Sequence, residues 1–144
     1  MREYATQMEA ARKGIITPEM KIVAKKEYRT EEEIREWVAK GQVAICANRL
    51  HTCIDPNGVG SMLRTKINVN LGVSRDCKDY DVEMKKVQAA VDMGAEAIMD
   101  LSSHGNTQRF RRKLTSECTA MIGTVPVYDS VIHYHRDLAT LTAK

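Results

Sequence analysis

Three residues of the sequence follow or end short apolar runs and carry side chains that suit the binding of a small polar molecule. They are Asn70, Met99 and Tyr128, and successive members are 29 positions apart. The amide of asparagine and the phenol of tyrosine can form hydrogen bonds with a polar heterocycle or a ribose. A methionine side chain can pack beside such a ring, although a role in the core is its more common use. The trio is therefore a candidate substrate-binding set.

The period of 29 residues fits one β-strand followed by one α-helix. The hydrophobic pattern predicts three such pairs, at 65–70 and 81–93, 97–101 and 106–114, and 121–125 and 129–141. This order is typical of parallel strands in one sheet, and ligands of such sheets bind at the C-terminal ends of the strands. We therefore expect the trio to face one site with the other polar residues of that edge, which are Asn48, Ser74, Asp100, Ser102, Ser103, His104 and Thr124.

Two interpretations of Asp100 remain open at this point. Its carboxylate could pair with an amino group or act as an acid or base, or it could cap backbone groups at the end of the strand. The turn at 102–105 precedes a predicted helix and could offer backbone N–H groups to an anion. No Ser/His/Asp constellation is recognisable from spacing, so the catalytic residues stay unknown.

Residues 1–41 are predicted to form a separate helical region. A short helix is expected from Thr6 to Lys13, and a second helix begins at Thr17-Pro18. Thr30 and Glu33 have the spacing of a capping box, which predicts a third helix that ends at Gly41. A further strand is expected at 43–47 beside the others, followed by a loop at 49–61 in which His51 lies at the surface.

The composition is that of a soluble globular domain. Of 144 residues, 43% are hydrophobic and 28% are charged, with a net charge of +3. This small positive charge suits phosphorylated metabolites and gives no indication of a nucleic-acid partner. The first residues are too polar for a signal peptide, and no apolar run reaches the roughly 20 residues that cross a membrane. We expect a cytoplasmic protein without a membrane partner.

The four cysteines show no spacing typical of a metal site, so no metal ligands are assigned in this chain. They are Cys46, Cys53, Cys77 and Cys118, and we interpret them as small buried side chains with free thiols. A basic cluster at 109–113 is interpreted as the solvated face of a helix.

Four motifs occur in order along the chain: Gly14–Met20, Lys66–Gly72, Gly94–Ser102 and Gly123–Tyr128. Together they resemble the N-terminal part of the phosphomethylpyrimidine synthase family, the radical S-adenosylmethionine enzymes of thiamin biosynthesis. The related 5-hydroxybenzimidazole synthases of anaerobic cobamide biosynthesis share these motifs. The resemblance covers about residues 1–130 and identifies the superfamily rather than one member.

The resemblance implies a (β/α)8, TIM-like barrel preceded by helices, with residues 1–41 as the helical region and 42–144 as the first βα units. It implies a lyase that converts 5-aminoimidazole ribonucleotide to 4-amino-5-hydroxymethyl-2-methylpyrimidine phosphate. A [4Fe-4S] cluster, S-adenosylmethionine and zinc are implied as cofactors, with protein ligands that lie outside this chain. Three substrate-binding positions of the family match Asn70, Met99 and Tyr128.

The sequence departs from the family pattern close to these positions. The family usually has Asn-Ile-Gly-Asn/Thr-Ser where this chain has Asn70-Leu-Gly-Val-Ser74, and Asp-Leu-Ser-Thr-Gly where it has Asp100-Leu-Ser-Ser-His104. It has Tyr-Gln where this chain has Tyr128-Asp129. These differences leave the exact product open.

Only three or four βα units fit within this sequence, which is half of a barrel. A half barrel exposes sheet edges and apolar surface, so we expect an N-terminal fragment or truncated homologue that is inactive alone and dimerises. Three functions remain in competition: the pyrimidine synthase, the benzimidazole synthase, which Arg64-Thr-Lys66 favours slightly, and a non-catalytic half-barrel binding protein.

Overall fold

The structure is a computed structural model that describes residues 3–135 and 138–142. The chain divides into two compact units. The first comprises Met1–Arg49 and Ile54–Lys66, and the second comprises Leu50–Cys53 and Ile67–Lys144. Residues 42–66, which the sequence pattern grouped with the βα units, thus fall mostly in the first unit. No helix of the described residues is both long enough and apolar enough to cross a membrane.

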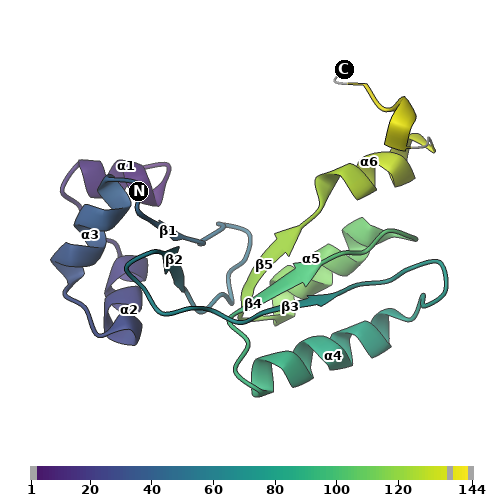
Figure 1. Ribbon diagram of the computed structural model, residues 1–144, viewed down its shortest axis with the longest axis horizontal. Helices are drawn as coiled ribbons and strands as arrows, with labels where there is room; N and C mark the ends of the chain where they lie inside the picture. Colours follow the sequence, from purple (N-terminus) through teal and green to yellow (C-terminus); the bar gives the residue numbers. More distant parts are fainter. Residues whose placement is uncertain (1–2, 136–137, 143–144) are drawn as a thin grey trace. The chain divides into compact units, whose positions relative to one another are not determined.

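The first unit contains three helices and a pair of short strands (Figure 1). The helices are α1 (Gln7–Arg12), α2 (Pro18–Glu27) and α3 (Glu31–Ala39). Each helix begins close to the position predicted from the sequence. At each start a threonine side chain, of Thr6, Thr17 or Thr30, accepts a backbone N–H of the first turn. Thr30 and Glu33 form the predicted capping box. Sequence-local capping therefore accounts for where these helices begin.

The core of the first unit is formed by apolar side chains of the helices and of the first strand. One charged residue is buried with them: Glu27, which binds the Nζ atom of Lys66 and accepts the backbone N–H of Arg64 at 2.8 Å. Burial opposes ionisation of Glu27, but these two partners together hold its pKa below the usual value. Arg64 and Lys66 thus have a structural function within this unit.

The expectation that strand 43–47 lies parallel to the others is wrong. Strand β1 (Val43–Ile45) pairs antiparallel with β2 (Gly58–Gly60), a strand inside the segment that was predicted to be a loop. Glycines usually weaken strands, but here Gly60 allows two backbones to approach closely, and Gly58 leaves room for the side chains of Val23 and Leu63. A Cβ atom at Gly60 would lie 2.3 Å from the carbonyl oxygen of Gln42, so no larger residue fits.

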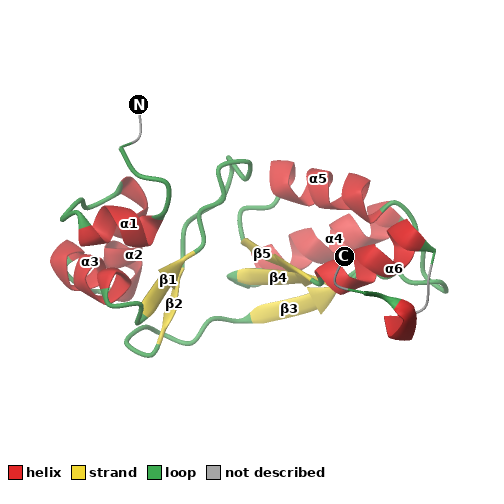
Figure 2. Cartoon of the chain, turned by 90° about the horizontal axis from the view of Figure 1, so that it is seen from above, coloured by secondary structure: helices red, strands yellow, loops and turns green. Residues whose placement is uncertain are grey.

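The second unit is an α/β sheet whose three strands are parallel, as predicted. Its strands are β3 (Asn68–Leu71), β4 (Ala97–Asp100) and β5 (Met121–Thr124), in the order β3-β4-β5. Helices α4 (Tyr80–Asp92) and α5 (Thr107–Glu117) connect them and lie on the same side of the sheet (Figure 2). The described residues form an open sheet rather than a closed barrel.

The core of this unit lies between the sheet and the two connecting helices. It contains Val87 and Ala90 of α4, Phe110 and Leu114 of α5, and Ile98 of β4. The other face of the sheet carries Asn68, Asn70 and Met99. Among the described residues, these three side chains are not part of the core that α4 and α5 form with the sheet. The alternation along the strands therefore directs Asn70 and Met99 away from the core.

The last helix differs from its prediction. A helix was expected at 129–141, but α6 runs from Pro126 to Tyr134 and is followed by a short 3-10 turn, Leu138–Thr140. Residues 136–137 of the expected helix lie outside the described residues. The helix begins earlier because a proline at the first helical position has the required φ angle and needs no N–H partner.

His51 and the cysteines also depart from expectation. His51 is buried rather than at the surface, and its Nε2 atom lies 2.5 Å from the carbonyl oxygen of Cys118 at the end of α5. The prediction of buried thiols is confirmed for Cys118 and wrong for Cys46 and Cys77, which are exposed. A polar side chain that finds a partner at a helix end can be buried, and sequence spacing does not reveal such a partner.

Candidate functional site

Asn70 and Met99 lie side by side at the C-terminal ends of adjacent strands. They are register partners in the β3–β4 pair, and Met99 is in turn the partner of Gly123 in β5. A Cβ atom at Gly123 would lie 2.7 Å from the Cε atom of Met99. The missing side chain of Gly123 therefore gives the thioether of Met99 room to lie across the sheet.

The amide of Asn70 is oriented by its neighbour on the same strand face. The Nδ2 atom of Asn68 donates a hydrogen bond of 2.8 Å to the Oδ1 atom of Asn70. Asn70 itself is exposed. Because Asn68 donates to this oxygen, the N–H2 group of Asn70 is a donor that an incoming acceptor could use.

Tyr128 is not at a strand end. It lies in the first turn of α6, where its backbone N–H donates to the carbonyl oxygen of Val125 at 3.0 Å, and 37% of the residue is exposed. Since α6 starts directly after β5, Tyr128 still belongs to the C-terminal edge of the sheet. The structure thus places Asn70 and Met99 in one row and Tyr128 on the adjoining helix.

The loops that follow β3 and β4 are joined by hydrogen bonds. The N–H of Leu101 donates to the carbonyl oxygen of Leu71 at 2.8 Å, and the N–H of Val73 donates to Ser102 Oγ at 3.1 Å. Gly72 makes this approach possible, because it has a φ of +142° and a Cβ atom there would lie 2.5 Å from Ser102 N. Ser102 therefore has a structural function.

A buried carboxylate that the sequence analysis missed supports the turn after Asn70. Glu83 of α4 is fully buried and accepts the N–H of Gly72 at 2.9 Å and the Nζ atom of Lys86 at 2.5 Å. The hydrogen bond to Glu83 raises the pKa of Lys86. The spacing of Glu83 and Lys86 is that of a common helix-surface pair, so no signal in the sequence showed that Glu83 is buried while Lys86 is exposed.

Asp100 is buried at the end of β4. Its Oδ1 atom accepts the N–H of Ser102 at 2.9 Å. This oxygen therefore caps a backbone group at the end of the strand, as one of the two interpretations of the sequence expected. Its Oδ2 atom has no hydrogen-bond partner among the described residues and lies 3.8 Å from Nε of Arg111. Arg111 belongs to the basic cluster expected to be solvated, and it is instead paired with carboxylates.

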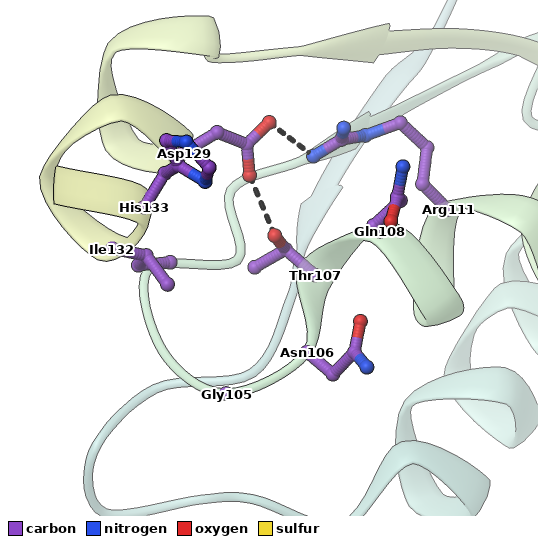
Figure 3. A pocket seen from close by; sticks show the side chains of 8 residues that line it. All are labelled: Gly105, Asn106, Thr107, Gln108, Arg111, Asp129, Ile132 and His133. Carbon is purple, nitrogen blue, oxygen red and sulfur yellow. Dashed lines mark hydrogen bonds and ion pairs between the residues drawn. The ribbon is translucent and has the colours of Figure 1, made fainter.

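A cavity of about 590 Å³ lies between the N-terminal part of α5 and helix α6 (Figure 3). Asp129 of α6 stands on its wall and accepts two bonds from α5, from Thr107 Oγ1 at 2.6 Å and from Arg111 Nη2 at 2.6 Å. His133 lies beside this carboxylate on α6. The remaining lining residues are Gly105, Asn106, Gln108 and Ile132. Two of the polar side chains of α5 that line the cavity, Thr107 and Arg111, are thus engaged by Asp129.

The other polar residues predicted for this edge do not all lie there. Asn48 belongs to the first unit, whereas Ser74 accepts the N–H groups of Asp76 and Cys77 in a tight turn of the second. Ser103 is exposed, and His104 and Thr124 are half-buried near the ends of β4 and β5. Of the residues predicted for this edge, only Asn70, Met99 and Thr124 therefore lie on the strands of the three-stranded sheet with partly accessible side chains.

No group of three or more His, Cys, Asp or Glu side chains among the described residues could hold a metal ion. The four cysteines are free thiols.

Comparison with known proteins identifies the family. The sequence pattern of the Radical SAM ThiC family matches residues 6–144. The phosphomethylpyrimidine synthase of Alkaliphilus oremlandii (strain OhILAs) is 60% identical over 142 residues, 99% of this chain and 32% of the relative. That of Clostridium botulinum (strain Hall) is 55% identical over 141 residues, 98% of this chain and 32% of the relative.

These matches extend over nearly all of the sequence, and they include the four motifs noted above. The chain spans about a third of the length of the curated relatives it matches. Membership in a radical S-adenosylmethionine family implies a [4Fe-4S] cluster and S-adenosylmethionine for the intact protein. The chain belongs to the Radical SAM ThiC family.

Proposed function

We propose that this chain forms part of an enzyme of thiamin biosynthesis that converts 5-aminoimidazole ribonucleotide to 4-amino-5-hydroxymethyl-2-methylpyrimidine phosphate. The observation that carries the proposal is 60% identity to a phosphomethylpyrimidine synthase along 99% of the chain. The departures from the family pattern lie at the end of β3, in the loops after β3 and β4 and, at Asp129, in helix α6, whereas Asn70 and Met99 themselves match it.

In this proposal the chain supplies one side of the substrate site. Asn70 donates a hydrogen bond to a polar substrate atom, Met99 packs beside the imidazole ring, and Tyr128 offers its hydroxyl. The cluster and S-adenosylmethionine supply the radical when they are bound. The residues of this chain bind and orient the substrate, and the apolar surface of Met99 helps to exclude water from it.

The benzimidazole synthase would use the same substrate and remains the alternative product class. The feature that favoured it, Arg64-Thr-Lys66, is used within the first unit, where Arg64 and Lys66 bind Glu27. The third possibility is a non-catalytic protein that binds a nucleotide or a partner subunit. Neither alternative is supported by a specific contact among the described residues.

One experiment separates the three functions. The full-length protein that carries this sequence is reconstituted anaerobically with iron and sulfide, then incubated with S-adenosylmethionine, a reductant and 5-aminoimidazole ribonucleotide. Mass spectrometry of the products is expected to show the pyrimidine phosphate. Formation of 5-hydroxybenzimidazole would replace the proposed product by the alternative, and substrate binding without turnover would favour the non-catalytic function.

A cytoplasmic location, a zinc ion and homodimeric assembly are further parts of this proposal. The open face and free edges of the β3-β4-β5 sheet favour association of the isolated chain. Sedimentation of residues 1–144 is expected to show dimers or larger species. A compact monomer at high concentration would contradict the half-barrel interpretation and favour a self-contained open sheet.

A further inference from the structure

Helix α6 is held to the second unit in an unusual way. None of its residues is buried, and Val125, the residue before it, makes no side-chain cap. Among the described residues, the side-chain hydrogen bonds and ion pairs that join α6 to the rest of the unit all end on Asp129. A helix of nine residues without apolar burial is marginal by itself, so these bonds determine how firmly its first turn is fixed.

The partners of Asp129 are themselves fixed in the structure. Thr107 is buried at the first position of α5 and donates from Oγ1 at 2.6 Å. Arg111, one turn further along α5, donates from Nη2 at 2.6 Å. The Nε atom of the same guanidinium lies 3.8 Å from the buried Oδ2 atom of Asp100. A continuous set of contacts therefore joins the end of β4, next to Met99, to the first turn of α6.

We propose that Asp129 is a positioning residue that places the phenol of Tyr128 at the substrate site. The inference rests on the proposed function, because it takes Tyr128 as a substrate contact. Asp129 follows Tyr128 directly, so a carboxylate held by two donors fixes the backbone from which the phenol projects. Arg111 carries one positive charge between the carboxylates of Asp100 and Asp129, and loss of either carboxylate changes how its guanidinium is held.

The cavity beside Asp129 does not offer a simpler explanation. Its strongest donors, Thr107 and Arg111, point to Asp129 rather than into the open volume (Figure 3). These donors are therefore part of the attachment of α6.

The test is a double-mutant cycle in the full-length, reconstituted protein. The wild type, Asp129→Asn, Tyr128→Phe and the double variant are compared by kcat and KM for 5-aminoimidazole ribonucleotide. Asp129→Asn is expected to raise KM about three- to tenfold, the equivalent of one hydrogen bond, with little change in kcat. In the Tyr128→Phe background the same change is expected to raise KM less than about twofold, because Asp129 acts through the phenol.

A second measurement does not depend on activity. Hydrogen exchange of the backbone amides of α6 is expected to be about three- to tenfold faster in Asp129→Asn, whereas that of α4 is unchanged, which also shows that the variant is folded. Asp92→Asn is the matched control, because the described partner of this exposed carboxylate, Gln88, lies on its own helix. This control is expected to change neither KM nor the exchange of α6.

The outcomes distinguish the inference from the proposed function. If Tyr128→Phe leaves KM unchanged, Tyr128 is not a substrate contact, and both the site assignment and the inference fail. If Tyr128→Phe raises KM but the effects of the two substitutions simply multiply, the site assignment stands and the positioning role is wrong. Unchanged exchange of α6 in Asp129→Asn would overturn the attachment itself.

Discussion

Helices α5 and α6 each follow a strand of the same sheet, yet they are held by different forces. Helix α5 buries Thr107, Phe110 and Leu114 and begins with the cap Asn106, whose Oδ1 atom accepts the N–H of Arg109 at 3.0 Å. Helix α6 buries no residue and has no side-chain cap. Apolar packing therefore holds α5, whereas polar bonds to Asp129 hold α6.

The difference shows which properties of a helix are local. The apolar positions of α5 recur with the period of a helix and are visible in the sequence. The attachment of α6 requires Thr107 and Arg111, which are 22 and 18 positions away from Asp129. Substitutions in α5 are thus expected to act on the stability of the whole unit, and those in α6 on the placement of one helix.

The largest expected effect is that of Phe110→Ala. Phe110 is 1% exposed, and its ring centroid lies 5.4 Å from that of Tyr80. Removing the ring leaves a cavity in the core of the second unit and is expected to lower the free energy of unfolding by about 3–5 kcal/mol. Urea unfolding monitored by circular dichroism measures this loss. The matched variant in α6 is Ile132→Ala, expected to cost less than about 1 kcal/mol; equal losses would contradict the comparison.

A smaller effect is expected from Gly72→Ala, in the turn that joins the loops after β3 and β4. The added Cβ atom would lie 2.5 Å from the backbone nitrogen of Ser102, which cannot move freely. Together with the strain of a φ of +142°, this is expected to cost about 1–3 kcal/mol in the same unfolding measurement. Gly94 has a φ of +90° with nothing within 4 Å of its Cβ position, so Gly94→Ala reports the backbone strain alone. A loss at Gly72 no greater than at Gly94 would show that the close approach to Ser102 is unimportant.

Removal of the cap of α5 is expected to have a still smaller effect on stability. Asn106→Ala leaves the N–H of Arg109 without its side-chain acceptor and is expected to lower the free energy of unfolding by about 1 kcal/mol. Gln108→Ala in the same turn removes no described hydrogen bond and is expected to change it by less than about 0.5 kcal/mol. If the two variants lose the same stability, the cap contributes nothing to α5.

Much of the fold was predictable because its signals are local. Threonine caps, glycine stops and apolar periodicity correctly located α1 to α5 and the three parallel strands. The pairing of β1 with β2 was not predictable, because it depends on Gly60, whose missing side chain lets the backbones of the two strands approach. The same reason applies to His51, whose partner is the carbonyl oxygen of a residue 67 positions away.

The candidate site was predictable to the extent that it depends on strand register. The spacing of Asn70 and Met99 made them neighbours, and the structure pairs them. Tyr128 has the same spacing but lies on a helix, because Pro126 begins α6 directly after β5. Glu83 and the Arg111–Asp129 pair were missed, since a charged residue in a helical pattern gives no indication that its partner lies on another element. Long-range polar contacts therefore limit what the sequence reveals.

The smallest expected effect concerns Asn70, which lies on the rigid sheet and not on α6. In the full-length protein, Asn70→Ala removes one hydrogen bond to a neutral group, worth about 0.5–1.5 kcal/mol, and is expected to weaken binding of 5-aminoimidazole ribonucleotide about three- to tenfold. Asn68→Ala removes only the donor that orients Asn70 at 2.8 Å, so its loss is expected to be smaller.

Equilibrium binding measured by calorimetry compares these two variants with Tyr128→Phe, for which a similar three- to tenfold loss is expected, about 0.5–1.5 kcal/mol. Because Asn70 is held by strand pairing and Tyr128 by the attachment of α6, Asp129→Asn is expected to leave the contribution of Asn70 unchanged while it reduces that of Tyr128. An unchanged affinity in both Asn70→Ala and Tyr128→Phe would remove these residues from the site. A larger loss for Asn68→Ala than for Asn70→Ala would place the contact two positions further back on β3, at Asn68.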